Sequence, residues 1–257
     1  GLPIDFSAAE KLHCKRQLCV KTATLSRETD WALPDGRRLR VSTLRLVPIG
    51  DAPLCVQVVT IEALNFAGLV ELSFPIAMAS GGGEACDDPR ISAKAGFIPA
   101  GSQSNARGHV ARFVSGGHGT VHLSVAQALS IAGEFGETDL DRSASARLAP
   151  GQCMIVNRLV AVAADDQIAC TSLDQARLLG IAALSERHQQ ALDQWWQQSE
   201  IAIEGDARLT LAIRYNLLHL FMSASRSDRH GIAAKGLTGE GYEGHYFWDT
   251  EVFVLPV

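Results

Sequence analysis

The hydrophobic pattern of this 257-residue chain changes its period near residue 171, and that change constrains the fold more than any other feature. Before it, apolar residues alternate with polar ones in short runs separated by turn residues, which is typical of β-strands. After it, apolar residues recur at every third or fourth position, which is typical of helices. The sequence therefore predicts a β-rich region followed by an α-helical one.

Turn residues divide the first region into short strands. Pro34-Asp-Gly36 is a turn signal, and a strand is expected shortly after it. Pro75 cannot donate a hydrogen bond to a neighbouring strand, so its strand is expected at a sheet edge or a bulge. Several strands at this spacing predict a β-sandwich. The expected strands cover residues 38–47, 54–63, 70–78, 121–125 and 153–162.

Two helices are expected between residues 172 and 200. Ser172-Leu-Asp-Gln175 fits a capping box, and the run from Ala176 to Leu184 is rich in helix formers. Ser185 is expected to cap the second helix. One face of that helix holds two adjacent tryptophans, which we interpret as packing residues rather than as a sugar platform. The residues on this face are His188, Leu192, Trp195, Trp196 and Ser199.

A further helix is expected after Asp206, whose carboxylate can cap it. Its apolar stripe is expected to face a neighbouring element and consists of Leu209, Ile213, Leu217 and Leu220. The sequence thus predicts a mixed β and α protein in three parts. These are a β-sandwich over residues 1–170, a helical linker over 171–200, and the beginning of an all-helical domain over 201–257.

Composition and charge exclude several classes of protein. The net charge is −5 and the basic residues are scattered, so nothing favours nucleic acid or an anionic membrane as partner. No apolar run approaches the roughly 18–20 residues that a membrane-spanning helix needs. Gly1 is not a natural start and no signal-peptide pattern follows it. We therefore expect a cytoplasmic protein of which this chain is a part.

The six cysteines are spread without a repeated spacing, unlike those of a small secreted scaffold, so reduced thiols are expected. Cys14 and Cys19 lie near His13 in the sequence. A second pair of ligands is missing, so no metal site is predicted.

The segment from Gly236 to Glu251 carries most of the functional signal. Its glycines favour unusual backbone angles or the close approach of another group. Rings stand beside carboxylates there, which suits a sugar, because rings pack on its C–H faces and carboxylates accept hydrogen bonds from its hydroxyls. The aromatic and acidic residues are Tyr242, Tyr246, Phe247, Trp248, Glu240, Glu243, Asp249 and Glu251.

Other interpretations stay open. Gly239-Glu-Gly-Tyr-Glu-Gly244 fits a dinucleotide-binding pattern, although no β-branched strand precedes it and its glutamates would repel a pyrophosphate. Asp249 could serve only as the N-cap of a helix, and Trp248 only as core filling. A non-catalytic carbohydrate-binding or structural β-sandwich module would explain residues 1–170 but not the glycine-rich segment.

The stretch from Ala234 to Pro256, which contains Phe-Trp-Asp-Thr-Glu, resembles glycoside hydrolase family 65, and Leu211–Leu220 is similar to that family's first barrel helix. Members are mostly inverting phosphorylases of α-linked glucose disaccharides such as maltose, trehalose and kojibiose. The resemblance implies a family-65 N-terminal β-sandwich, linker helices and the start of an (α/α)6 barrel. It also implies further strands ahead of the region where this chain begins.

The resemblance implies roles for individual residues as well. Trp248 and Asp249 match the pair that lines the subsite for the transferred glucose. The family's general-acid Glu lies well downstream of this motif, so it is expected beyond Val257 and no catalytic residue is expected in this chain. The residues expected to support the substrate-binding pair are Phe247, Glu251, His245 and Glu240.

The implied reaction is attack of inorganic phosphate on an α-glucoside, which gives β-glucose 1-phosphate. Phosphate is then a co-substrate beside the disaccharide, and no cofactor is expected. A related hydrolase acting on trehalose stays open as the alternative. A homodimer also stays open, because unpaired strand edges favour self-association.

Overall fold

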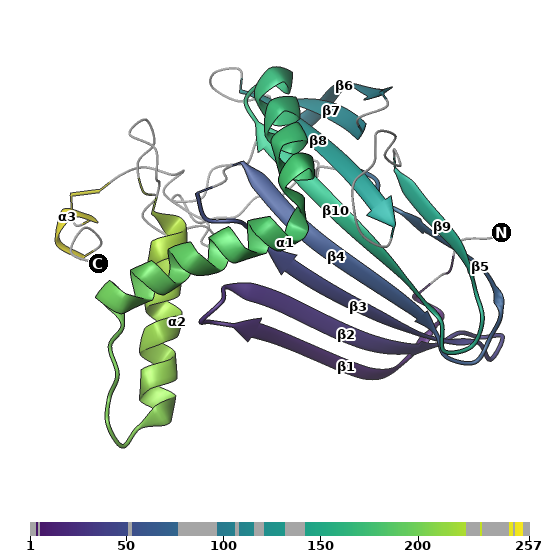
Figure 1. Cartoon of the computed structure of the whole chain (residues 1–257), viewed down its shortest axis with the longest axis horizontal. Helices are drawn as coiled ribbons and strands as arrows, with labels where there is room; N and C mark the ends of the chain where they lie inside the picture. Colours follow the sequence, from purple (N-terminus) through teal and green to yellow (C-terminus); the bar gives the residue numbers. More distant parts are fainter. Residues whose placement is uncertain are drawn as a thin grey trace, which may run out of the picture. The chain divides into compact units, whose positions relative to one another are not determined.

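The computed structural model describes residues 4, 6–50, 53–76, 97–105, 108–115, 121–131, 142–224, 232, 247, 248 and 250–253 (Figure 1). The chain divides into two compact units. The sheet unit consists of Gly1–Cys19, Thr24–Met78 and Phe97–Ala191. The helical unit consists of Val20–Ala23, Ala79–Gly96 and Leu192–Val257.

The sheet unit is built from antiparallel strands in two sheets (Figure 1). Eight strands form a large sheet in the order β1-β2-β3-β4-β10-β8-β7-β6, and β5 pairs with β9 in a small one. The strands are β1 Glu10–Cys19, β2 Thr24–Ala32, β3 Arg38–Leu46, β4 Leu54–Ala63, β5 Gly68–Ser73, β6 Phe97–Asn105, β7 Gly108–Ser115, β8 His122–Ile131, β9 Ser143–Leu148 and β10 Cys153–Ala163.

The two sheets pack face to face, which confirms the predicted β-sandwich. Val59 and Ile61 of β4 share one buried cluster with Leu148 of β9 and with Val70 and Leu72 of β5. Burial of apolar surface in such an interface contributes about 25 cal/mol of stabilising free energy per Å². This burial is the main interaction that holds the two sheets together. The strand predicted over 70–78 is wrong at its far end, because β5 ends at Ser73, before Pro75.

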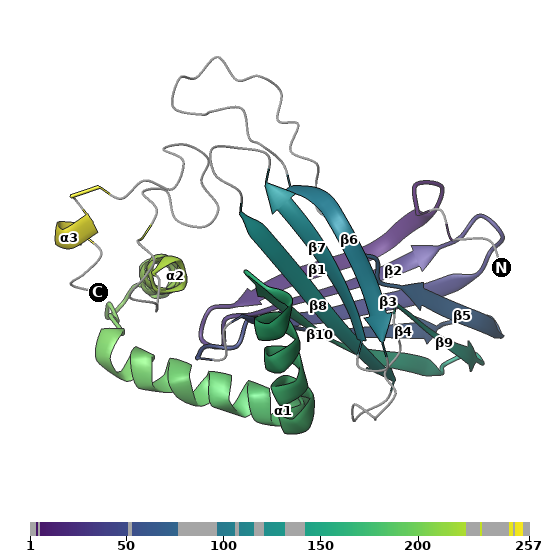
Figure 2. The ribbon, with the colours of Figure 1, turned by 90° about the horizontal axis from the view of Figure 1, so that it is seen from above.

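The predicted start of the linker helix at Ser172 is also wrong. Helix α1 spans Asp166–Ser199 and so begins six residues earlier. The Asp165 carboxylate accepts the Ile168 N–H at 2.8 Å and caps the new end. The helix does break, but at Gly180 (φ 75°, ψ 161°) rather than at Ser185, and Figure 2 shows the bend. Only glycine adopts those angles readily, so Gly180 permits the bend.

Helix α1 covers the face of the large sheet opposite to the small sheet. We call the parts of α1 before and after Gly180 its first and second arms. Leu173 and Ala176 of the first arm are buried in one cluster with Leu54 of β4 and Leu159 of β10. Strand β4 therefore alternates, since Leu54 faces α1 while Val59 faces the small sheet. Burial on both faces explains why β4 is rich in Val and Ile.

In the helical unit, α2 spans Ala207–Ser223 and α3 spans Thr250–Phe253. Asp206 caps α2 as predicted, because its carboxylate accepts the Leu209 N–H at 2.8 Å. The predicted apolar stripe is partly wrong. Leu217 is buried, but Leu209 is 46% exposed. In the described part of the chain, no helix combines the length and apolar content that crossing a membrane requires.

Candidate functional site

Part of the predicted sugar-binding segment lies within the described residues, in the helical unit. Trp248 is 76% exposed and Phe247 is half-buried. The Phe247 carbonyl accepts the Thr250 N–H at 3.1 Å, which turns the chain into α3. Glu251 belongs to α3. The residues that lie outside the described ones are Asp249, His245 and Glu240.

The exposure of Trp248 bears on one of the open alternatives. A tryptophan that fills a core is almost entirely covered, whereas this ring presents most of its surface to solvent. The described residues of this chain therefore do not bury the Trp248 ring in a core, and its role stays a prediction. The start of α3 at Thr250 agrees with a helix beginning directly after Asp249. Because the Asp249 side chain is not described, capping and sugar binding both stay open for it.

The two adjacent tryptophans of α1 pack as predicted. Trp196 is 5% exposed, and its indole N–H donates to the Lys21 carbonyl at 3.1 Å. Trp195 stacks on Phe221 of α2, with ring centroids 4.2 Å apart and planes inclined by 20°. Trp196 is thus buried and Trp195 is stacked on another ring of the protein, so the interpretation as packing residues is confirmed.

Helix α2 leaves several large apolar side chains in solvent. Leu211 is 56% exposed, Tyr215 45% and Met222 39%. These residues fall at spacings of four and seven along the helix, so they share one side of it. An apolar side of this kind is typical of a helix that packs against further protein.

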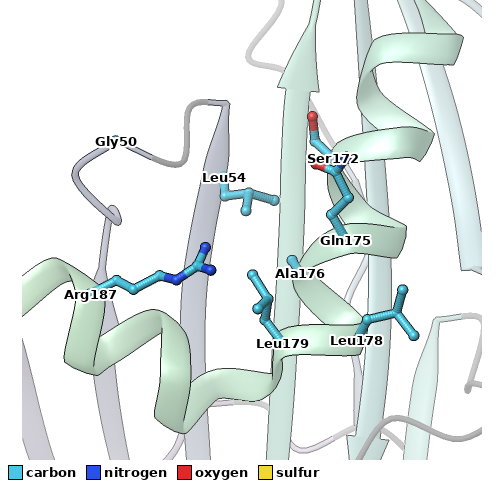
Figure 3. Close-up of a pocket in the computed structure, with 8 residues that line it drawn as sticks. All are labelled: Gly50, Leu54, Ser172, Gln175, Ala176, Leu178, Leu179 and Arg187. Carbon is cyan, nitrogen blue, oxygen red and sulfur yellow. The ribbon is translucent and has the colours of Figure 1, made fainter.

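The sheet unit contains a cavity of about 410 Å³ on the inner side of the α1 bend (Figure 3). Figure 3 shows Arg187 reaching toward it from the second arm of α1. None of the described residues that line it carries a carboxylate, so these residues offer no acid or base for cleaving a glycosidic bond. The residues lining it are Gly50, Leu54, Ser172, Gln175, Ala176, Leu178, Leu179 and Arg187.

An ion pair at the start of α1 serves the fold. Arg112 of β7 donates from Nε to Asp166 Oδ2 at 2.7 Å, and the Ser124 hydroxyl of β8 donates to Oδ1 at 2.6 Å. The Arg112 guanidinium beside Asp166 holds the pKa of that carboxyl below its usual value, and the hydroxyl lowers it further. A general acid needs the opposite, a raised pKa, so Asp166 fixes the helix to the sheet instead.

A second charged group lies on the large sheet. Arg40 holds Asp30 through two hydrogen bonds of 2.7 and 2.9 Å, and this contact lowers the pKa of the Asp30 carboxyl. Among the described residues, no three His, Cys, Asp or Glu side chains converge in a way that could hold a metal ion.

Comparison with known proteins identifies the family. The description "Glycosyl hydrolase family 65, N-terminal domain" matches residues 1–195, and "Glycosyl hydrolase family 65 central catalytic domain" matches residues 214–257. The chain belongs to glycosyl hydrolase family 65. The second match covers the later part of α2, from residue 214, and the segment that contains Trp248, so the resemblance at the Phe-Trp-Asp-Thr-Glu motif is confirmed.

Individual relatives agree with this assignment. An α,α-trehalose phosphorylase of Thermoanaerobacter brockii is 25% identical over 285 residues, covering 100% of this chain and 35% of its own length. The kojibiose phosphorylase of Escherichia coli K12 is 29% identical over 266 residues, covering 94% and 33%. This chain spans about a third of the length of the curated relatives it matches.

A solved structure supports the fold. A chain described as a kojibiose phosphorylase from the human microbiome superimposes with a TM-score of 0.69 at 20% identity, covering 98% of this chain and 34% of the other. At this identity the likeness speaks for the fold alone.

Proposed function

We propose that this family-65 protein cleaves the α-glucosidic bond of a disaccharide by inverting phosphorolysis and releases β-glucose 1-phosphate. The observation that carries the proposal is the exposed Trp248 in a Phe-Trp-Asp-Thr-Glu motif, inside the stretch that matches the family's catalytic domain. The trehalose and kojibiose phosphorylases among its relatives support the same reaction class.

The chemistry accounts for every atom of the reaction. A phosphate oxygen attacks the anomeric carbon of the α-glucosyl unit from the side opposite to the leaving sugar. The bond from that carbon to the glycosidic oxygen breaks, and a carboxylic acid gives its proton to the departing oxygen. Because phosphate is already a nucleophilic anion, one carboxylic acid suffices and no second carboxylate is needed to activate water.

The roles assigned to this chain are substrate binding. The Trp248 indole packs on the C–H face of the glucosyl ring, and the Asp249 carboxylate accepts hydrogen bonds from its hydroxyls. Phe247 and Glu251, together with His245 and Glu240, support this pair. The general acid is a Glu outside these 257 residues.

The reaction is tested by incubating the full-length protein with maltose, trehalose and kojibiose, each with and without inorganic phosphate. Glucose 1-phosphate should form from one of them only when phosphate is present, and its anomeric configuration, read by NMR, should be β. Release of glucose at the same rate without phosphate would assign the protein to the hydrolases of the family instead.

The 257 residues made alone should cleave none of these sugars, because the proposed acid lies outside them. Turnover of any α-glucoside above the blank would place the acid inside this chain. The roles given to Trp248 and Asp249 would then have to be reassigned. Weak binding of glucose without turnover is the expected result.

A further inference from the structure

The two faces of the large sheet carry different charges at the β1–β3 end. In an antiparallel sheet, directly paired residues point to the same face, so the strand register assigns each side chain to one of them. We call the face covered by α1 the helix face and the face covered by the small sheet the small-sheet face. On the helix face, charges of both signs neutralise one another, since Arg40 lies within 3.9 Å of Glu28 and 3.7 Å of Glu62 and is hydrogen-bonded to Asp30.

At this end the described charges of the small-sheet face are all basic, namely Lys11, which pairs with Trp31, and a group of arginines. Arg16 of β1 pairs with Arg27 of β2, which in turn pairs with Thr43 of β3. Arg45 lies two residues after Thr43 in β3, so it points to the same face, and it pairs with Gln57 of β4. Gln57 in turn pairs with Arg158 of β10, so all of these side chains share one face. We define the arginine patch as Arg16, Arg27, Arg45 and Arg158.

The patch has no acidic partner in the described part of the chain. Arg16, Arg27 and Arg45 are exposed, and Arg27 makes its described hydrogen bond to a neutral hydroxyl, that of Thr29, at 3.2 Å. Arg158 is half-buried and donates only to amide oxygens, those of Gln127 at 2.8 Å and Gln57 at 3.3 Å. No side chain of the patch is within ion-pair distance of a described Asp or Glu.

Repulsion between these arginines destabilises the chain when no ligand is bound. Arg16 and Arg27 lie directly opposite each other, and like charges in that position repel. Burial lowers the pKa of the Arg158 guanidinium, and the nearby Arg45 acts in the same direction. A ligand with several negative charges would remove this repulsion at all four positions at once, whereas a single anion would reach only one or two of them.

We propose that the arginine patch is an interaction surface for an acidic polypeptide segment that lies across β1, β2, β3 and β10. The distance from β1 to β10 is four strand spacings, about 19 Å, which an extended segment of roughly six to eight residues covers. Carboxylates on such a segment accept hydrogen bonds from guanidinium groups in paired geometry. This surface is separate from the proposed sugar site and does not depend on it.

The surroundings of the patch favour a polypeptide over other polyanions. Leu18 is 38% exposed and shares the face, and Leu25 pairs with it across β1 and β2. An alternation of acidic and apolar side chains matches both groups, which polyphosphate cannot do. The Phe74 ring lies 5.5 Å from the Arg158 guanidinium but is buried, so the described residues of the patch offer no exposed ring on which the bases of a nucleic acid could stack. The same face already packs against protein, namely β5 and β9.

Two cysteines give the test a built-in control. Cys14 is exposed and pairs with Thr29, so it lies on the small-sheet face beside the patch. Its pKa is lowered by the hydrogen bond from the Thr29 hydroxyl and by Arg27, which favours the reactive thiolate. Cys153 is also exposed but pairs with Glu62, so it lies on the helix face.

The experiment follows alkylation of both cysteines of the 257-residue chain by iodoacetamide, using mass spectrometry. A peptide of roughly eight residues alternating Glu and Val is added, and its Lys–Val counterpart serves as the charge control. At a peptide concentration ten times its Kd, Cys14 should react about tenfold more slowly, because that is the fraction of chain left unbound. The rate at Cys153 should stay within about twofold.

Variants assign the effect to the patch. Arg16→Gln and Arg45→Gln should each weaken binding of the fluorescein-labelled peptide about two- to fivefold in an anisotropy assay, as loss of an exposed charge contact does. Arg38→Gln, at an exposed site on the helix face, should leave it unchanged. Raising the salt concentration should also weaken binding of the peptide to the wild-type chain, because salt screens the charges.

Several results would overturn the proposal. They are absence of protection, equal protection of both cysteines, protection by the Lys–Val peptide, or variants that behave like Arg38→Gln. Equal protection by tripolyphosphate would make the patch a site for small oxyanions. Tighter binding of oligo-dT than of the acidic peptide would make it a nucleic-acid surface.

Discussion

The two units of this chain differ in how they use apolar residues. The described hydrophobic clusters all lie in the sheet unit, where the sheets and the first part of α1 bury residues such as Leu129 and Leu159 completely. The helical unit buries Leu217 and Leu218, yet leaves Leu211 and Trp248 largely in solvent. A unit that covers its own apolar surface can fold by itself, whereas exposed apolar rings and chains remain available for contact with something else.

The two units are therefore expected to contribute differently, the sheet unit mainly to stability and the helical unit to the proposed function. In the sheet unit, apolar residues pack against each other, and the charged groups Asp166 and Asp30 are held by arginines. In the helical unit, Trp248, which we propose to bind sugar, is the most exposed tryptophan described. Substitutions in the two units should therefore have different consequences.

The largest effect is expected for Leu129→Ala in the sheet unit. This side chain is fully buried between the sheets, so truncating it should lower the free energy of unfolding by about 2–5 kcal/mol. Leu211→Ala in the helical unit removes the same atoms from a residue that is 56% exposed and should cost less than about 0.5 kcal/mol. Urea denaturation of both variants measures this. Similar losses in both would mean that the helical unit has a core of its own.

Asp249→Ala should reduce the activity of the full-length protein more than its stability. Loss of a carboxylate that binds glucose hydroxyls is worth on the order of 2–4 kcal/mol, so kcat/KM should fall roughly 30- to 1000-fold. Asp206→Ala is the matched control, because Asp206 caps α2 and its loss should cost about 1 kcal/mol of stability with little change in kcat/KM. If Asp249→Ala behaved like this control, Asp249 would be only a cap.

Gly180→Ala should destabilise the sheet unit by about 1–3 kcal/mol. The backbone at Gly180 lies at φ 75° and ψ 161°, where a side chain is strained, although a Cβ there would meet no atom within 4 Å. Gly68→Ala is the control, because its Cβ would make only an ordinary contact with Phe66 at 3.9 Å. A thermal melt followed by circular dichroism compares them. Equal melting temperatures would show that the bend tolerates other residues.

The smallest effect is expected for Asp166→Asn, at about 1–2 kcal/mol near neutral pH. The pKa of Asp166 is lower in the folded protein than in the unfolded chain. Its stabilisation is therefore present above the unfolded pKa of roughly 3.9 and is lost as the pH falls through the folded pKa. The difference in unfolding free energy between wild type and variant should shrink as the pH is lowered from about 7 to about 3.

The control for this titration is Asp35→Asn. The pKa of Asp35 is also lowered, by the side chain of Arg37, but both groups stand in solvent at the turn before β3. Water and salt screen such a pair, so no measurable pH-dependent difference is expected. A difference as large as that of Asp166 would contradict the role given to the α1 ion pair.

Much of the secondary structure could be predicted from local signals. Alternation placed β3, β4 and β10 close to their observed bounds, and the carboxylate of Asp206 marked the start of α2. Local signals failed where a stronger neighbour competed. Ser172 has the sequence pattern of a helix cap. Asp165 lies upstream of it and caps the helix there, so α1 begins at Asp166 and continues through Ser172 without interruption.

The site was predictable only in part. The motif around Trp248 identified the family, and the family match confirms it. The exposure of Trp248 was not predictable, because a tryptophan beside apolar residues reads equally well as core. The arginine patch was invisible as well. Its members are scattered between residues 16 and 158, and only the strand register brings them to one face.

The sequence by itself therefore determined what depends on neighbours along the chain. The strand and helix periods, the Asp206 cap and the family motif belong here, because dihedral preferences and capping act over a few residues. The tertiary structure alone decided what depends on pairing across the chain. The bend of α1 at Gly180 against the sheet, the ion pair from Arg112 to Asp166 and the faces to which the charges point are set by packing, since a strand has two faces and only its partners determine which one is covered.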